Sequence, residues 1–119
     1  MKLLITTIAA VLVVGTALAD PIHDAAGNGD LAGVQAELDK GVDVNKKVNG
    51  VTPLHQAAIR GHKEIAKLLI AKGAHLNAKD DVGKLGRTPL DWTFGKKETA
   101  ALLRKHGGKT AEELKAAGN

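Results

Sequence analysis

The apolar residues at positions 50–77 (GVTPLHQAAIRGHKEIAKLLIAKGAHLN) recur at the spacing of short helices. Leu54, Ala57 and Ala58 stand at i, i+3 and i+4, which predicts one helix with a single apolar face. A second apolar series, Ile65–Ile70, predicts another helix. The stretch is therefore expected to form a helix, a tight turn, a second helix and an extended loop.

Residues typical of helix boundaries flank both predicted helices. Thr52 is a typical N-cap, because its hydroxyl can accept a hydrogen bond from a free backbone N–H of the first turn. Pro53 suits the first helical position, where no N–H is needed and where its fixed φ matches the helix. Gly61 and Gly73 follow the two apolar series and are typical of helix ends.

The same pattern occurs three times along the chain. Residues 20–26 (DPIHDAA) copy residues 52–58 (TPLHQAA) at an offset of 32, and residues 88–90 (TPL) copy the start of that segment at an offset of 36. All three prolines of the protein thus occupy the same place in their copies. A period of this length predicts a solenoid in which each unit packs on its neighbours.

The third copy is shorter than the second. Residues 97–103 (KETAALL) match residues 63–69 (KEIAKLL) at an offset of 34, so two residues are missing where the second copy has Ile59 and Arg60. We therefore expect the first helix of the third copy to be shorter or to end irregularly.

The T-P-L-H, A-A, G-H, L-L and G-A pattern of residues 52–74 resembles the ankyrin repeat, a unit of roughly 33 residues. The resemblance implies an all-α fold, an ankyrin-repeat solenoid of three helix-turn-helix repeats with hairpin loops. The repeats are expected at about 20–49, 50–82 and 86–108, within a domain spanning 20–109.

The segment 110–119 is expected to form a short C-terminal helix. Thr110 and Glu113 have the spacing of a capping box, in which two side chains each bond the other residue's backbone N–H. Three repeats are about the least that bury a continuous core. We therefore expect this helix to cover the apolar face of the last repeat as a cap and to contribute to stability.

In proteins of the ankyrin family the loops between repeats form hairpins that project beside the helices. The first loop, residues 46–51 (KKVNGV), contains the turn signal Asn49-Gly50. The second loop, residues 78–87 (AKDDVGKLGR), is a few residues longer. Its extra length is either a tolerated insertion, since loops accept length at little cost, or a lengthened finger that touches a partner.

Residues 1–19 are expected to be a signal peptide. Lys2 precedes the apolar run Leu3–Val14, and Ala17-Leu18-Ala19 is a small-x-small pattern that predicts cleavage after Ala19. The alternative is a retained membrane anchor, for which the run is short of the roughly 20 residues a span needs. After cleavage no stable membrane insertion is expected. An exported chain without cysteine favours a bacterial envelope, so we expect a periplasmic or secreted bacterial protein.

Composition narrows the class of partner. Loss of Lys2 with the signal peptide leaves a net side-chain charge of +3, which is too mild an excess to argue for nucleic acid. One Trp and one Phe cannot form a stacking platform for single strands. Trp92 is either a surface anchor or a residue that fills space between repeats two and three. We expect a monomer that binds protein.

The sequence predicts no catalytic, cofactor-binding or metal-binding residues. The chain contains neither Ser nor Cys, so the commonest nucleophiles are absent. His55 and His62 are seven residues apart in different predicted helices and lack the i, i+4 spacing of a helical metal pair. The ankyrin resemblance instead gives His55, and His23 in the first repeat, a structural hydrogen bond.

The resemblance also implies that a protein partner binds the hairpin tips and the concave helix face. Ile59 beside Arg60 is either an interface hot spot, as apolar anchors with Arg often are, or a stray apolar residue on a surface. The positions that correspond to the family's binding side are Asn28, Val48, Asn49, Val51, Ile59, Arg60, Lys84, Leu85 and Arg87.

The expected function is therefore non-enzymatic protein–protein interaction outside the cytoplasm. Two alternatives stay open at the level of sequence. One is a structural accessory that stabilises an envelope enzyme, for example in peroxide defence. The other is a small metal-binding protein or enzyme.

Overall fold

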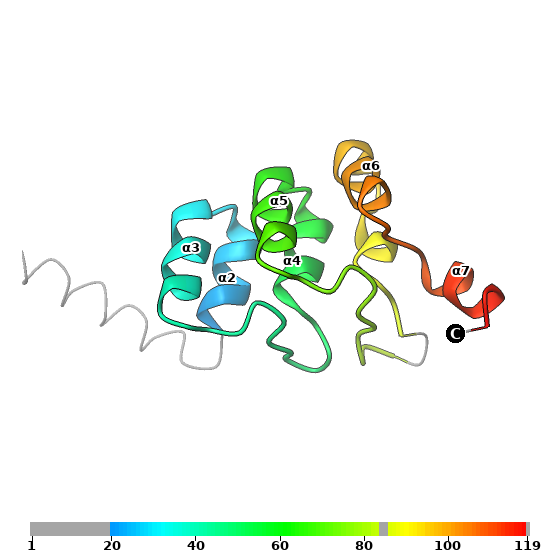
Figure 1. The fold of residues 1–119 in the computed structure, drawn as a ribbon, viewed down its shortest axis with the longest axis horizontal. Coiled ribbons are helices and arrows are strands. Elements are labelled where there is room, and N and C mark those ends of the chain that lie inside the picture. Colours follow the sequence, from blue (N-terminus) through cyan, green and yellow to red (C-terminus); the bar gives the residue numbers. More distant parts are fainter. Residues whose placement is uncertain (1–19, 84–85, 119) are drawn as a thin grey trace, which may run out of the picture.

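The computed structural model describes residues 20–83 and 86–118, and helices account for most of its regular structure (Figure 1). The predicted helix-turn-helix pairs form in the first two repeats, and the third repeat pairs one 3-10 turn with one helix. The elements are α2 (Pro21–Asn28), α3 (Leu31–Asp39), α4 (Pro53–Arg60), α5 (Lys63–Ala71), η1 (Leu90–Trp92), α6 (Lys97–Lys105) and α7 (Ala111–Ala116).

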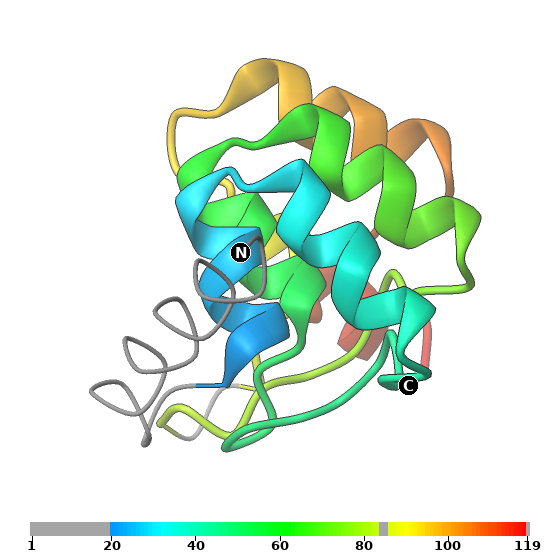
Figure 2. The same ribbon diagram turned by 90° about the vertical axis from the view of Figure 1, so that its left-hand side faces the viewer.

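The repeats stack into two layers of helices. The inner layer consists of α2, α4 and η1, and the outer layer of α3, α5 and α6, which lie side by side in Figure 2. Each layer is held by contacts between like elements of successive repeats, and α2 with α3 and α4 with α5 join the layers. The fold is thus the all-α solenoid that the repeated pattern predicts.

The core lies between the two layers and is built from small and medium aliphatic side chains. Alanine at the helix contacts lets the backbones approach closely, and larger residues fill the space between repeats. Its fully buried members, each with an exposed fraction of 0%, are Ile22, Ala26, Val34, Leu54, Ala57, Ala58, Ala66, Leu69 and Leu103.

The inner helices begin and end where the sequence predicts. The Thr52 hydroxyl accepts from the N–H of His55, while the His55 side chain accepts from the N–H of Thr52, so the two form a capping box at the start of α4. Gly29 and Gly61 follow α2 and α4 with φ of 79° and 72°. Glycine adopts this left-handed conformation without steric cost, which ends each helix sharply.

The third repeat has a shortened inner element, as the two-residue deletion predicts. Only Leu90–Trp92 is helical, in a 3-10 turn that starts from Pro89. Thr88 still forms its half of a cap, because its hydroxyl accepts from the N–H of Asp91 and the Asp91 carboxylate accepts from the N–H of Thr88. Asp91 therefore replaces His55 in the local cap of its repeat.

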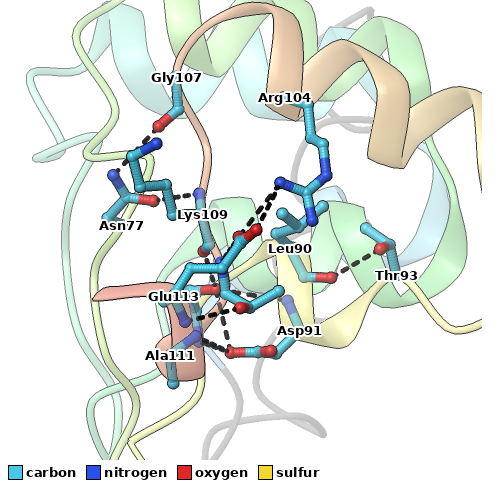
Figure 3. A network of polar contacts seen from close by, with 11 residues as sticks. Asn77, Leu90, Asp91, Thr93, Arg104, Gly107, Lys109, Ala111 and Glu113 are labelled. Carbon is cyan, nitrogen blue, oxygen red and sulfur yellow. Dashed lines mark hydrogen bonds and ion pairs between the residues drawn. The ribbon is translucent and has the colours of Figure 1, made fainter. Parts of the chain in front are cut away.

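Two asparagines join the extended loops of successive repeats. Asn45 donates from Nδ2 to Gly73 O at 3.2 Å and accepts from the N–H of His75 at 2.7 Å. Asn77 repeats both bonds one repeat further on, to Gly107 O at 3.3 Å and from Lys109 N at 2.7 Å (Figure 3). The same pair of bonds thus joins both pairs of successive repeats, although the second pair spans two more residues of sequence.

Helix α7 forms at the predicted place and has the predicted capping box of Thr110 and Glu113. It lies beyond the last repeat and buries none of its residues. The expectation that it covers an apolar face was therefore wrong. Polar contacts hold it instead. The Asp91 carboxylate accepts from the N–H of Ala111 at 2.8 Å, and Arg104 contacts both carboxylate oxygens of Glu113 at 3.1 Å (Figure 3).

Deleting residues 110–119 is expected to lower the free energy of unfolding by about 1 kcal/mol. The deletion removes the half-buried hydrogen bond from Ala111 to Asp91, which contributes about 1 kcal/mol. It also removes the exposed ion pair of Arg104 and Glu113, which contributes less than about 1 kcal/mol. For a domain of this size the thermal midpoint should fall by about 4–8 °C. Thermal unfolding followed by circular dichroism measures the change, and an unaltered midpoint would contradict the docking of α7 on the third repeat.

Residues 1–19, where a signal peptide is predicted, lie outside the described residues. Within the described segments 20–83 and 86–118, none of the helices has both the length and the apolar character that crossing a membrane requires.

Candidate protein-binding surface

The first finger, residues 46–51, is a tight hairpin beside the inner helices. Val48 and Val51 exchange both backbone hydrogen bonds at 2.9 Å. Between them Asn49 and Gly50 have φ of 56° and 76°, the positive values that a two-residue hairpin turn requires. The turn predicted from Asn49-Gly50 is therefore confirmed. At the tip Val48 and Asn49 are exposed, while Gly50 and Val51 are buried.

The second finger, residues 78–87, packs against the first. Asp81 donates its backbone N–H to Asn49 O at 3.0 Å. A Cβ added to Gly50 would lie 2.5 Å from Asp81 N, so only glycine permits this close approach. The fingers of the first two repeats thus stand side by side at a fixed spacing.

Asp80 closes the base of the second finger. It is 3% exposed, exchanges hydrogen bonds with Arg87, and accepts from Trp92 Nε1 at 2.7 Å. The Trp92 ring in turn packs edge-on against His55, with ring centroids 5.1 Å apart. Trp92 therefore fills space between repeats two and three, as one of the two interpretations of this residue held. The hydrogen bond from Trp92 Nε1 to Asp80 also anchors the second finger to the third repeat.

His55 ties the second finger to α4. Its Nδ1 accepts from the Thr52 N–H at 3.1 Å, so the proton of the neutral ring is on Nε2, which donates to Arg87 O at 2.9 Å. Burial lowers the pKa of His55 below its ordinary value, although the bond to Arg87 opposes this shift. His55 is thus a neutral structural tether rather than a base exposed to substrate.

His23 makes the equivalent tether in the first repeat. Its Nε2 lies 2.7 Å from Val51 O, and its Nδ1 lies 3.2 Å from Asp20 Oδ1. Lys46 Nζ is 2.7 Å from the other oxygen of Asp20. Burial acts to raise the pKa of Asp20, but Lys46 and His23 together lower it below its ordinary value. Both fingers are therefore held by a histidine from the preceding inner helix.

The state of His55 predicts a stability that depends on pH. Because its pKa is lower in the folded than in the unfolded chain, the unfolded chain binds more protons below the ordinary value of about 6.5. The free energy of unfolding should keep its full His55 contribution above pH 6.5 or so and should decrease as the pH falls from there toward the lower pKa of the folded state. Urea unfolding between pH 7.5 and 5 measures the decline. We expect a smaller slope for His55→Gln and an unchanged slope for the exposed control His106→Gln. If the stability of His55→Gln declined with pH as steeply as that of the wild type, His55 would not be the group whose lowered pKa causes the decline.

The predicted partner-binding residues fall into two groups at opposite ends of the inner layer. Asn28 and Arg60 are exposed where α2 and α4 end, with Ile59 half-buried beside Arg60. The fingertip residues lie at the other ends of these helices, roughly 12 Å away along eight helical residues. The exposed members of this second group are Val48 and Asn49 at the tip of the first finger and Arg87 at the base of the second.

Val51 was expected in this binding surface, but only 7% of it is exposed. Its backbone pairs with Val48 and its carbonyl faces His23, so it supports the finger from inside. Its side chain is therefore unavailable to a partner. Lys84 and Leu85 lie outside the described residues.

Two exposed apolar residues on the same elements were missed by the sequence analysis. Val82, in the second finger, is 49% exposed, and Phe94, in the turn after η1, is 65% exposed. Each directly precedes a glycine, Gly83 and Gly95, both with positive φ. A large apolar residue beside a turn glycine has no helix face to bury it, and this signal was present in the sequence.

The described part of the chain holds no gathering of three or more His, Asp and Glu side chains with the geometry of a metal site. The buried titratable groups, His23, His55 and Asp80, are engaged in the structural bonds described above. The described residues instead form a surface made of the inner elements α2, α4 and η1 and the two fingers, which we call the platform.

Comparison with known proteins identifies the class of protein that this platform defines. A model of the family "Ankyrin repeats (3 copies)" matches residues 21–113. The chain therefore belongs to the ankyrin-repeat family, whose repeats are protein–protein interaction modules.

A solved structure and several relatives agree with this membership. The chain resembles the crystal structure of the human ASB11 ankyrin repeat domain with a TM-score of 0.68 and 34% identity, over 76% of this chain and 41% of that one. It is 38% identical over 86 residues to ankyrin repeat domain-containing protein 37 of Bos taurus, covering 70% of this chain and 52% of the relative. It is 34% identical over 87 residues to serine/threonine-protein kinase 12 of Arabidopsis thaliana, covering 71% and 18%.

The chain spans less than two thirds of the length of these relatives. The name of one relative, serine/threonine-protein kinase 12, is that of an enzyme, but the match covers only 18% of its length. The ankyrin repeats themselves are generally binding modules without catalysis.

Proposed function

We propose that this protein is exported from the cytoplasm and binds a protein partner through its fingertips and the inner-helix face, without catalysing a reaction. The observation that carries the proposal is the set of hydrogen bonds that holds the two fingers in place. Both fingers are tethered by a buried histidine, and the second finger bonds the first. A surface ordered in advance loses little conformational entropy when a partner docks.

The chemistry of the surface also suits a protein partner. Exposed apolar side chains at the fingertips, Val48 and Val82, alternate with polar and charged ones. Arg60 extends from the end of α4 with an exposed side chain. An apolar contact beside Arg is a common pairing in protein interfaces. Ile59, which is half-buried beside Arg60, supplies apolar area to this contact.

Export is proposed on the sequence of residues 1–19 and on the start of the fold. Asp20, the residue after the predicted cleavage site, already contacts His23 and Lys46. The first residue that cleavage would leave thus already makes contacts within the first repeat. N-terminal sequencing of the protein from fractionated cells tests this, and a chain that begins at Met1 in the cytoplasmic fraction would contradict export.

The binding surface is tested by affinity capture with matched variants. Val48→Glu with Arg60→Glu places acidic groups on the proposed face, and the control Ala101→Glu with Lys67→Glu makes the same charge change on the outer helices. All four positions are exposed. A partner retained by the wild type should be retained by the control and lost by the first variant. The affinity of the first variant should fall by about 30-fold or more, the effect of removing a hot spot of about 2 kcal/mol. Equal retention by both variants would contradict the assigned face.

A further inference from the structure

Different side chains fill the two junctions between successive repeats, at the turns that join each inner element to its outer helix. At the first junction, the His62 imidazole packs over Gly29, where an added Cβ would lie 2.9 Å from His62 Cε1. His62 Nε2 also lies 3.1 Å from Gly27 O, which accepts its hydrogen bond. The space between repeats one and two is thus closed by a side chain whose polar atom is satisfied.

At the second junction, Lys96 stands where His62 stands in the repeat before. Its aliphatic stem covers Gly61, where an added Cβ would lie 2.8 Å from Lys96 Cδ. Among the residues that the structure describes, its ammonium forms no hydrogen bond or ion pair. A hollow of about 300 Å³ remains there, lined by Gly61, Gly95, Lys96, Lys97, Glu98 and Thr99.

Two features of the sequence explain why this hollow exists. The third repeat lacks the two residues that correspond to Ile59 and Arg60, so its inner element ends early. Thr99 takes the place of Ile65 in the outer helix and is the smaller side chain. The third repeat therefore has less side-chain volume than the second with which to fill this place.

Thr99 adds a polar side chain to the lining of the hollow. It is 2% exposed, yet its hydroxyl has no hydrogen-bond partner within the described segments. The hydroxyl oxygen nevertheless keeps some accessible surface, since it is not among the fully buried side-chain atoms that lack a partner. The residue lines the hollow, where a bound group can accept its hydrogen bond.

The start of α6 adds further donors. This nine-residue helix begins at Lys97, and its N-cap, Lys96, has no side-chain acceptor for the free N–H groups of the first turn. The positive end of the helix dipole favours an anion at this place. The lining also includes Glu98, but its side chain is 86% exposed and pairs with Lys63 at 3.9 Å.

We propose that the hollow between the α4–α5 turn and the start of α6 binds an oxyanion, either a phosphate group or a carboxylate. Lys96 and Lys97 supply charge, the first-turn N–H groups of α6 supply directional donors, and the Thr99 hydroxyl supplies a further donor from the lining. The surrounding chain is basic, since residues 60–109 contain 12 Lys and Arg against 5 Asp and Glu, while residues 20–59 contain 3 against 6. This charge distribution draws anions to the half of the solenoid that holds the hollow. The site is distinct from the fingertips and does not depend on the proposed partner.

Titration of the purified, ¹⁵N-labelled protein followed by amide chemical shifts tests the proposal. Sodium phosphate and sodium acetate are added in separate arms, with sodium chloride at equal ionic strength as the reference. We expect saturable shifts of the Lys97, Glu98 and Thr99 amides with phosphate, acetate or both. Saturation by one anion alone assigns the site to that group. Shifts that follow ionic strength in every arm overturn the proposal.

Variants separate a built site from general attraction to a basic surface. Lys96→Gln with Lys97→Gln should weaken binding at least tenfold, while the exposed control Lys105→Gln should bind as the wild type does. Thr99→Val keeps the volume and removes only the hydroxyl, so it should stay folded and weaken binding about threefold. Equal affinity in the Lys96→Gln, Lys97→Gln and Thr99→Val variants and the wild type overturns the proposal.

Discussion

Replacing His55 with alanine is expected to lower the free energy of unfolding by about 3 kcal/mol. The side chain is fully buried and joins three parts of the molecule, since it bonds Thr52 and Arg87 and packs against Trp92. Removing it leaves the Thr52 N–H and the Arg87 carbonyl without their partner, at about 1–3 kcal/mol for each group that stays buried. The loss of packing around the cavity adds to this cost.

Urea unfolding at pH 7.5 measures the effect. The control is His75→Ala, because His75 is exposed and, within the segments 20–83 and 86–118, its side chain forms no hydrogen bond. The control should change stability by less than about 0.5 kcal/mol. A His55→Ala protein with the stability of the control would mean that the tether between α4 and the second finger does not form.

Replacing Leu54 with alanine is the second change with a large expected effect, also about 3 kcal/mol. Leu54 has an exposed fraction of 0% in α4, which contacts α2, α5 and η1. A cavity at this position cannot close easily, because the neighbouring repeats hold their own register, and buried Leu→Ala changes cost about 2–5 kcal/mol. In a solenoid the central repeat carries both interfaces, so the loss weakens coupling along the whole chain.

Thermal and urea unfolding with two probes, circular dichroism and Trp92 fluorescence, measure both stability and coupling. Trp92 reports on the junction of the second and third repeats. The matched control is Leu31→Ala in α3, where the side chain is 45% exposed and the change should cost well under 1 kcal/mol. If Leu54→Ala costs no more than Leu31→Ala, then α4 is not the centre of the core.

The fold could be predicted from the sequence because the repeated unit is specified locally. Thr52, Pro53 and Gly61 each act through the backbone of their own helix, so their positions determine where α4 begins and ends. The deletion after Phe94 likewise predicted the shortened inner element η1. Contacts within one repeat are local in sequence, and pattern arguments apply to them directly.

The missed features depend on contacts between repeats. Asp91 occupies the position of His55, but in the described residues after α6 the chain leads to α7 rather than to a hairpin, and Asp91 bonds the Ala111 N–H. This bond docks α7 by polar contact, where the sequence analysis expected apolar cover. Val51 likewise corresponds to a position on the family's binding side, yet it is only 7% exposed, and its carbonyl contacts His23 of the preceding repeat. Burial by a neighbouring repeat is not encoded in the spacing of the residue itself.

The candidate surface was predicted in part for the same reason. Exposure of Asn28, Arg60 and Val48 follows from their places in one repeat. Phe94 and Val82 were missed because helical periodicity says nothing about residues in turns. The hollow beside Thr99 arises from a deletion in one repeat and a substitution in its outer helix, and its shape required the packing of both.

Site-specific photo-cross-linking in the producing cell tests the central claim most directly. A photoreactive amino acid is placed singly at Val48, Arg60, Lys67 and Ala101, four exposed positions that sample the finger and inner-helix side and the outer helices. The account predicts one cross-linked protein band from Val48 and Arg60, in the envelope or secreted fraction, and none from Lys67 and Ala101. The same band from the outer positions, with none from Val48 or Arg60, would contradict the claim that a partner binds the fingers and the inner-helix face.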